Sequence, residues 1–219
     1  MKKLFFVLTI ITFFSQSALA INCDDLIVAP NINLQSSFGN LQYNTSLDIK
    51  EITSMAKKFD LVESDLFASG LATATVNFDI SLSTSANPIN VGEFCVIPNK
   101  VDVFLGLTNP VIYLANSLEK NSCRYKIVLR HEQTHQQINK SALEYYLPIF
   151  KAAITKIIQK TPAITIKDTS QLEQATKDLT ETYNQKIMPL VEFIKKEIAN
   201  EQKKLDNPAN YKYESVLCK

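Results

Sequence analysis

The chain is poor in glycine and has no large excess of charge of either sign. Its four glycines, at positions 39, 70, 92 and 106, form none of the glycine-rich loops that cradle phosphate groups. Its 23 basic and 22 acidic residues leave a formal net charge of +1. A chain with so weak a field is not attracted strongly to nucleic acid or to an anionic membrane. We therefore expect neither a nucleotide site nor a nucleic-acid partner.

A long apolar run occurs only at the start, and it is too short to cross a bilayer. Residues 1–20 are typical of an export signal: Lys2 and Lys3 form a basic start, residues 4–14 an apolar core, and residues 18–20 a small-residue cleavage site. We expect cleavage after Ala20 and a soluble mature chain of about 199 residues, periplasmic or secreted, without stable membrane insertion. Asn22 is not the small residue that lipidation of Cys23 would require, so no lipid anchor is expected.

The four cysteines, Cys23, Cys95, Cys123 and Cys218, all follow the predicted signal. An even number in an oxidising compartment predicts two disulfides, one of which can tie an end of the chain to the body. Four cysteines can pair in three ways, and the sequence does not choose among them. A cysteine zinc site is the alternative, although the sequence contains no C-x-x-C pair.

The pattern predicts a single domain after the signal, mainly β with one helix over residues 21–118, helical over 119–206, and ending in a tail over 207–219. The helix of the first part is expected to start at Ser46 or Asp48 and to reach Phe59. A turn is expected at residues 98–100, which contain Pro98. The strand candidates are residues 26–28, 32–34, 41–43, 75–82, 94–97, 101–105 and 111–115.

Both histidines of the chain lie in the segment Arg130-His131-Glu132-Gln133-Thr134-His135. On a helix, residues i and i+4 share a face, so His131 and His135 can offer two imidazole nitrogens to one ion. Glu132 points about 100° away, which suits a group that works beside the metal without binding it. This is the H-E-x-x-H pattern of two zinc ligands followed by a general base. The alternative is a solvated helix with two surface histidines.

Residues 123–138, which follow a short predicted strand and a helix cap at Asn121 and Ser122, resemble the active helix of zincin metallopeptidases. The exported chain with a helical second half also resembles secreted bacterial zinc-dependent proteases. The resemblance covers about a tenth of the chain. It implies an α+β, zincin-like fold with a small, mostly antiparallel sheet, followed by the H-E-x-x-H helix. Apolar residues at helical spacing in residues 142–160 and again after Ser170 predict a long C-terminal helical hairpin packed on that helix. The resemblance also implies that an extended peptide binds at a sheet edge.

No third histidine is available as a ligand. Ile138 and Ser141 stand where the longer metzincin pattern has glycine and histidine, which excludes that subgroup. A carboxylate is then the expected third ligand, and Glu144 comes first in sequence. In an unbroken helix Glu144 would lie about 13 Å along the axis from His135, so the assignment requires a bend near residues 139–141. Ser141 and Glu144 could instead form a helix capping box. The later candidates are Glu173, Glu181 and Glu192.

The sequence thus predicts a zinc peptidase in which Glu132 is the general base and Zn²⁺ activates a water that attacks a peptide or protein substrate. Tyr145 or Tyr146 is a candidate donor to the oxyanion, whereas Arg130 is expected at the surface. Two alternatives remain: an exported metal-binding protein without catalysis, and a helical interaction module that binds no metal. The sequence indicates no oligomeric state.

Overall fold

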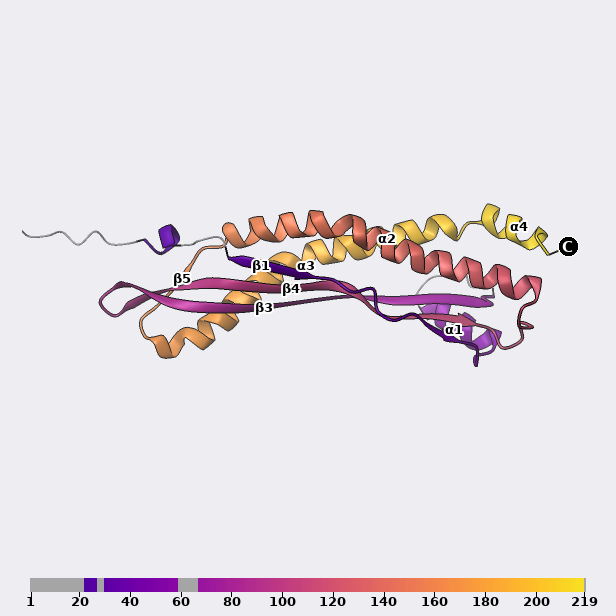
Figure 1. The fold of residues 1–219 in the computed structure, drawn as a ribbon, viewed down its shortest axis with the longest axis horizontal. Helices are drawn as coiled ribbons and strands as arrows, with labels where there is room; N and C mark the ends of the chain where they lie inside the picture. The colour runs from indigo at the N-terminus through magenta and orange to yellow at the C-terminus, as the bar shows by residue number, and fades with distance from the viewer. Residues whose placement is uncertain (1–21, 27–29, 59–66, 219) are drawn as a thin grey trace, which may run out of the picture.

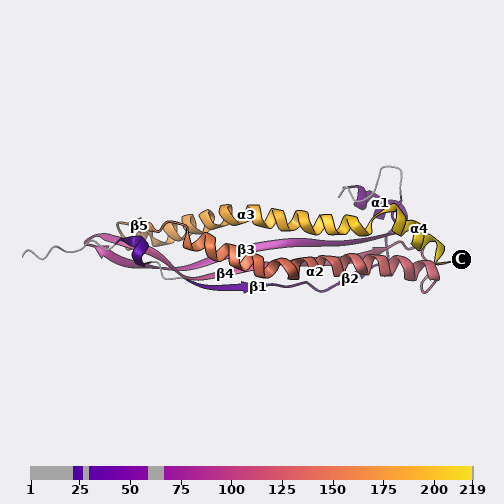
Figure 2. The same ribbon diagram turned by 90° about the horizontal axis from the view of Figure 1, so that it is seen from above.

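The computed structural model describes residues 22–26, 30–58 and 67–218. The predicted export signal, residues 1–20, lies outside this range. The described chain forms an elongated, two-layered α+β structure in which two long helices, α2 (Cys123–Gln159) and α3 (Leu172–Leu205), cover one face of a long β-hairpin. Figure 2 shows the two helices running along the length of the hairpin.

The hairpin consists of β3 (Gly70–Asn90) and β4 (Glu93–Leu114), joined by a tight turn at Val91 and Gly92. Gly92 has a φ of 74°, which a glycine adopts without steric cost. The turn predicted at residues 98–100 is wrong, because β4 runs straight through it. Pro98, which has no N–H to donate, lies opposite Thr84 at a register shift, and such a bulge accommodates it within the strand.

The prediction of a small, mostly antiparallel sheet is also wrong. Two further strands, β1 (Asn31–Gln35) and β2 (Gln42–Asn44), pair with β4 in parallel. The short strand β5 (Ile164–Ile166) and β3 pair with β4 in antiparallel fashion. The sheet is therefore mixed, and it is built on strands of 21 and 22 residues. Alternation of apolar residues predicts strands, but it does not predict which way two separated strands run.

The helix α2 starts at the predicted cap, where the Ser122 hydroxyl accepts a hydrogen bond from the Tyr125 N–H at 3.1 Å. It continues through residues 139–141 and Pro148 without interruption, so the bend expected there is absent. A single helix thus contains the H-E-x-x-H segment and also forms the first arm of the predicted helical hairpin. A 3₁₀ turn, η2 (Thr169–Gln171), leads into the second arm, α3.

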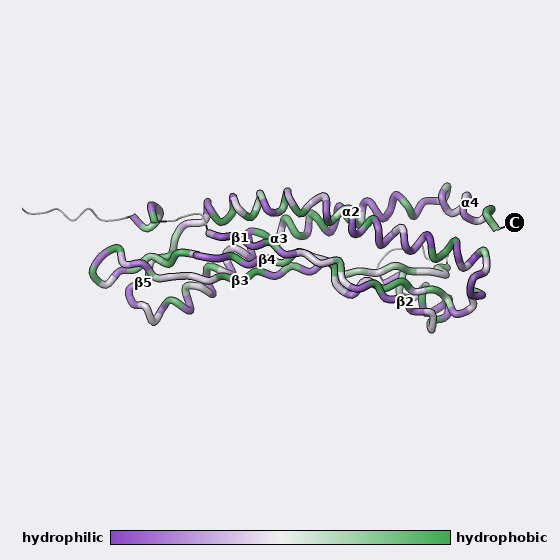
Figure 3. Tube along the Cα trace, viewed as in Figure 1, coloured by the Kyte–Doolittle hydropathy of each residue, from purple (hydrophilic) through white to green (hydrophobic). Residues whose placement is uncertain are grey.

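The main core lies between the helices and the hairpin. In β4, alternate residues from Val101 to Leu107 face the helices, and each is almost completely buried. The helices contribute residues at helical spacing, among them Phe150 and Ile154 of α2 and Ile187 of α3. Burial of each such side chain stabilises the fold by about 1.5–3 kcal/mol. Figure 3 shows polar and apolar stretches alternating along both helices, as expected of helices that bury one face.

Short elements complete the two ends. The helix α1 (Ile49–Lys58) begins at Asp48, whose carboxylate accepts from the Glu51 N–H at 2.8 Å; its predicted end, Phe59, lies outside the described residues. Of the strand predicted at residues 26–28, residues 27 and 28 lie outside the described residues, and Leu26 ends the 3₁₀ turn η1 (Cys23–Leu26). The segment predicted to be a tail forms the helix α4 (Pro208–Val216).

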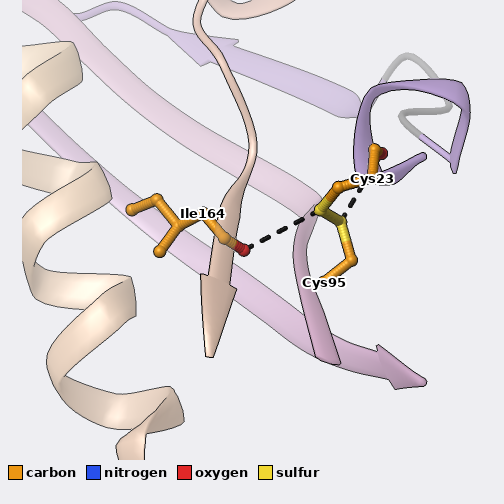
Figure 4. The surroundings of a disulfide bond; sticks show 3 residues. All are labelled: Cys23, Cys95 and Ile164. Carbon is orange, nitrogen blue, oxygen red and sulfur yellow. Dashed lines mark hydrogen bonds between the residues drawn. A yellow bond between two sulfur atoms is a disulfide. The ribbon is translucent and has the colours of Figure 1, made fainter. Parts of the chain in front are cut away.

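Both predicted disulfides are present. One joins Cys23 of η1 to Cys95 of β4, with the Cys23 Sγ 3.9 Å from the carbonyl oxygen of Ile164 in β5 (Figure 4). The other joins Cys123, at the start of α2, to Cys218, just beyond α4, with 5.6 Å between the Cα atoms. Disulfides persist in oxidising compartments, so this pairing is consistent with export. No helix in the described ranges has the length and apolar character needed to span a bilayer.

Candidate metal centre

The first half of α2 places His131, Glu132 and His135 inside the molecule. Their exposed fractions are 6%, 6% and 9%, so they are not the surface residues of a solvated helix. The helical spacing puts the two imidazoles on one face, with ring centroids 4.8 Å apart. This face is turned towards the end of α3 and towards α4.

A third polar group reaches the histidines from Asp206, which stands at the junction of α3 and α4. Asn207 caps α4 by accepting a hydrogen bond from the Asn210 N–H at 2.9 Å, and Pro208 occupies the first turn. The Asn207 and Asn210 side-chain amides donate to the carbonyl oxygen of Leu205 at the end of α3. These local bonds define the bend that directs Asp206 at the histidines.

The three side chains converge on one point. The Nε2 atoms of His131 and His135 lie 3.1 Å apart, and each lies 3.1 Å from Oδ1 of Asp206. Three ligands about 2.0–2.2 Å from a tetrahedral zinc ion would lie roughly 3.3–3.6 Å from one another. The three atoms are thus placed as one face of a tetrahedral shell, and the group can hold a metal ion.

The other nitrogen of each ring has its own partner. His131 Nδ1 lies 3.1 Å from a carboxylate oxygen of Glu214 in α4, which can only accept a hydrogen bond. His135 Nδ1 faces Oε1 of Gln202, whose amide nitrogen donates to the His135 carbonyl oxygen at 3.0 Å and to Asn139 Oδ1 at 2.6 Å. Both Nδ1 atoms therefore carry hydrogens, and in the neutral rings both Nε2 atoms are acceptors.

Three acceptors that meet within 3.1 Å need a cation between them, either a metal ion or protons. Burial lowers the pKa of His131 and of His135, but the hydrogen bonds with Asp206 and the surrounding carboxylates raise both by more. Burial raises the pKa of Asp206, yet the hydrogen bonds from the two histidines hold it well below its usual range. Without a metal, protons on the histidines would fill the role of the cation.

Glu132 lies beside this group and against the start of β3. Its carboxylate accepts a hydrogen bond from the Ala72 backbone N–H. Burial raises the pKa of Glu132 to about 7, against the opposing effect of charge on His135 and His131. A carboxyl group with this pKa can both accept and release a proton near neutral pH.

Tyr211 of α4 closes one side of the centre. Its ring stacks on His131, with centroids 5.5 Å apart, and its hydroxyl donates to Asp206 Oδ1 at 2.6 Å. Burial and this hydrogen bond raise the pKa of the Tyr211 hydroxyl, which keeps its proton. A protonated phenol is thereby held next to the candidate ligand oxygen.

The structure does not bring Glu144 to the histidines. It lies further along the unbroken helix α2, exposed, with its carboxylate 3.9 Å from the Lys140 ammonium group. Ser141 does not cap a helix either, and its hydroxyl accepts from Gln137. The later candidates are exposed along α3, where Glu173 pairs with Lys177, Glu181 with Gln185, and Glu192 with Lys195. Asp206 takes the position expected for a glutamate.

The predicted tyrosines are also elsewhere: Tyr145 is 67% exposed and contacts Tyr146, which in turn contacts Phe193 of α3. Arg130 is at the surface. Four residues of the centre were not among the predicted site residues: Asp206, Tyr211, Glu214 and Gln202. In the sequence, Asn207 and Pro208 indicate only the end of a helix.

Comparisons of the chain with protein-family models, with curated proteins and with solved structures find no match. The geometry of the centre therefore has to support any functional proposal by itself. Chemically, the arrangement combines three potential metal ligands, a carboxyl group that can exchange a proton near neutral pH, and a phenolic donor.

Proposed function

We propose that the chain is an exported zinc-dependent peptidase that hydrolyses peptide bonds with a metal-activated water. The observation that carries the proposal is the convergence of His131 Nε2, His135 Nε2 and Asp206 Oδ1, each 3.1 Å from the other two, beside a buried glutamate. Two imidazoles and one carboxylate are a ligand set that suits zinc and leaves a fourth position for water.

Zinc bound there would polarise the scissile carbonyl and lower the pKa of its water from about 15.7 towards about 7. Glu132 would accept the proton of that water and pass it to the leaving amine, for which a carboxyl pKa of about 7 is well matched. Glu214 and Gln202, through the two Nδ1 hydrogens, would hold the imidazoles in the orientation and tautomer that bind metal. Tyr211 would take the role predicted for Tyr145 or Tyr146 if its hydroxyl turned its hydrogen from Asp206 Oδ1 to the developing oxyanion.

An extended peptide has a sheet edge available next to Glu132. Among the described strands, β3 pairs only with β4, so the backbone groups along its other edge have no strand partner. The Ala72 N–H, which donates to Glu132, belongs to this strand. Main-chain hydrogen bonds along such an edge would give affinity for peptides of many sequences.

The test compares wild type with Glu132→Gln in cleavage of an unfolded protein substrate such as casein. Glutamine has nearly the shape of glutamate but cannot accept the proton, so turnover should be abolished while zinc stays bound. Glu144→Gln is the matched control, because it makes the same change on the exposed side of the same helix, and it should cleave normally. If Glu132→Gln cleaves as fast as wild type, the proposed mechanism is wrong.

An exported metal-binding protein without catalysis is the second candidate. The low exposure of His131, Glu132 and His135, between 6% and 9%, favours it. Wild type that binds zinc tightly but cleaves no peptide would support this candidate. Wild type that binds no metal would instead support the helical interaction module.

A further inference from the structure

Gly70, the first residue of β3, lies directly against Glu132. A Cβ atom at position 70 would stand 2.5 Å from Oε1 of Glu132, 2.8 Å from its Cγ, and 2.6 Å from Cγ1 of Val128. All three distances are shorter than side chains tolerate, so even a methyl group does not fit here without movement. The space occupied by the Glu132 side chain is the space that a side chain at 70 would take.

The backbone does not require glycine at this position, since Gly70 is not among the residues with positive φ. The atoms in conflict all belong to side chains of α2, and one of them, Oε1 of Glu132, is the far end of a flexible side chain. Gly106 in β4 offers a contrast. A Cβ there would meet the backbone oxygen of Ser37 at 2.7 Å and its nitrogen at 2.9 Å, as well as the ring of Phe104 at 2.6 Å. A methyl group at 70 would therefore displace the Glu132 carboxylate, whereas one at 106 would strain the backbone far along the hairpin.

We propose that Gly70 is a positioning residue for Glu132: the missing side chain lets the carboxylate lie at the start of β3, beside the metal ligands, where Ala72 can donate to it. The inference rests on the proposed function, because it assigns Gly70 to the placement of the general base. A displacement of a catalytic group by about 1 Å can cost on the order of 10²-fold in rate.

The first test measures thermal stability, without reference to catalysis. Gly70→Ala should lower the Tm of the wild-type protein, and it should lower the Tm of the Glu132→Ala variant by clearly less, because two of the three conflicting atoms are then gone. Equal losses in the two backgrounds would overturn the proposal. Should Gly70→Ala fail to fold, the proposal requires that Gly70→Ala with Glu132→Ala folds, and failure of both would overturn it.

The second test measures steady-state cleavage and zinc content. Gly70→Ala should bind zinc as wild type does and keep its KM, while kcat falls by about 10–100-fold. Gly106→Ala should lower Tm and keep kcat. A kcat for Gly70→Ala within twofold of wild type, or a loss of zinc together with activity, would overturn the proposal.

The two tests separate this inference from the proposed function. If wild type cleaves no peptide, the proposed function fails, but the stability comparison still reports whether Gly70 makes room for Glu132. If wild type is active and depends on Glu132, while Gly70→Ala is fully active, only the inference about Gly70 fails.

Discussion

Replacement of Asp206 by asparagine should weaken zinc binding severely. Asparagine keeps the size of the side chain but removes the negative charge, and its amide can turn an N–H towards His131 and His135. Structural zinc sites with four protein ligands bind with about 10–16 kcal/mol, or roughly 2.5–4 kcal/mol per ligand. Since about 1.4 kcal/mol corresponds to a tenfold change, we expect Kd to rise by about 10²–10³-fold.

A second effect of Asp206→Asn should offset part of the loss of zinc affinity. The hydrogen bonds with Asp206 help to raise the pKa of both histidines, so its removal makes their protons weaker competitors of zinc. The expected change for Asp206→Asn is therefore near the lower end, about 10²-fold, with a larger loss for Asp206→Ala.

The assay is competition for zinc against a coloured chelator at pH 7.5, on the disulfide-bonded protein. Glu144→Gln serves as the control, since this carboxylate is exposed and 3.9 Å from Lys140, and its Kd should equal that of wild type. Asp206→Asn with the affinity of wild type, or loss of zinc in Glu144→Gln, would refute the assignment of the third ligand.

Four further perturbations test the centre and the fold around it. Glu214→Ala, which deprives the His131 ring of its Nδ1 partner, should weaken zinc binding by about 10–100-fold in the same assay. Removal of the Cys123–Cys218 disulfide, which closes a loop of 95 residues, should lower the free energy of unfolding by about 2–5 kcal/mol and weaken zinc binding, because α4 is released. Removal of the other disulfide should lower stability in urea titrations but leave zinc affinity unchanged, and the opposite pattern would count against this account. In the metal-free protein, the raised pKa values of both histidines stabilise the fold below about pH 6.5. That stabilisation is lost as pH rises through the raised values. The raised pKa of Glu132 lowers the free energy of unfolding further as pH rises from 4.5, its unfolded value, to about 7. Urea titrations of the metal-free protein should thus give a lower free energy of unfolding at pH 8 than at pH 5. A free energy that is equal or higher at pH 8 would contradict the raised pKa values.

The parts of the fold that follow from local periodicity could be predicted from the sequence. The helix containing His131 and His135 starts at its predicted cap, Ser122, and it buries the face on which the two histidines lie. The course of β4 could not be predicted, because Pro98 is usually a turn signal. Only the register shift opposite Thr84, a property of the paired strand, makes it acceptable within a strand.

The third potential ligand depends on packing over a long sequence distance. The apolar spacing of the two helical regions predicts that α3 returns along α2, but it does not predict where the end of α3 lies relative to His131. Asp206 reaches the centre because α3 ends there and Asn207 turns the chain into α4. The predicted ligands were all glutamates, and an equal count of residues from the facing ends of α2 and α3 does not place Asp206 opposite His131. The Glu214 contact also depends on α4, in a segment that lacks a clear apolar period.

The central claim is that His131, His135 and Asp206 bind one zinc ion. Crystals of the protein grown with equimolar zinc should give, from data collected just above the zinc absorption edge, a strong anomalous peak about 2.0–2.2 Å from His131 Nε2, His135 Nε2 and Asp206 Oδ1. A structure in which that position has no peak, with zinc absent or bound at other side chains, would contradict the claim.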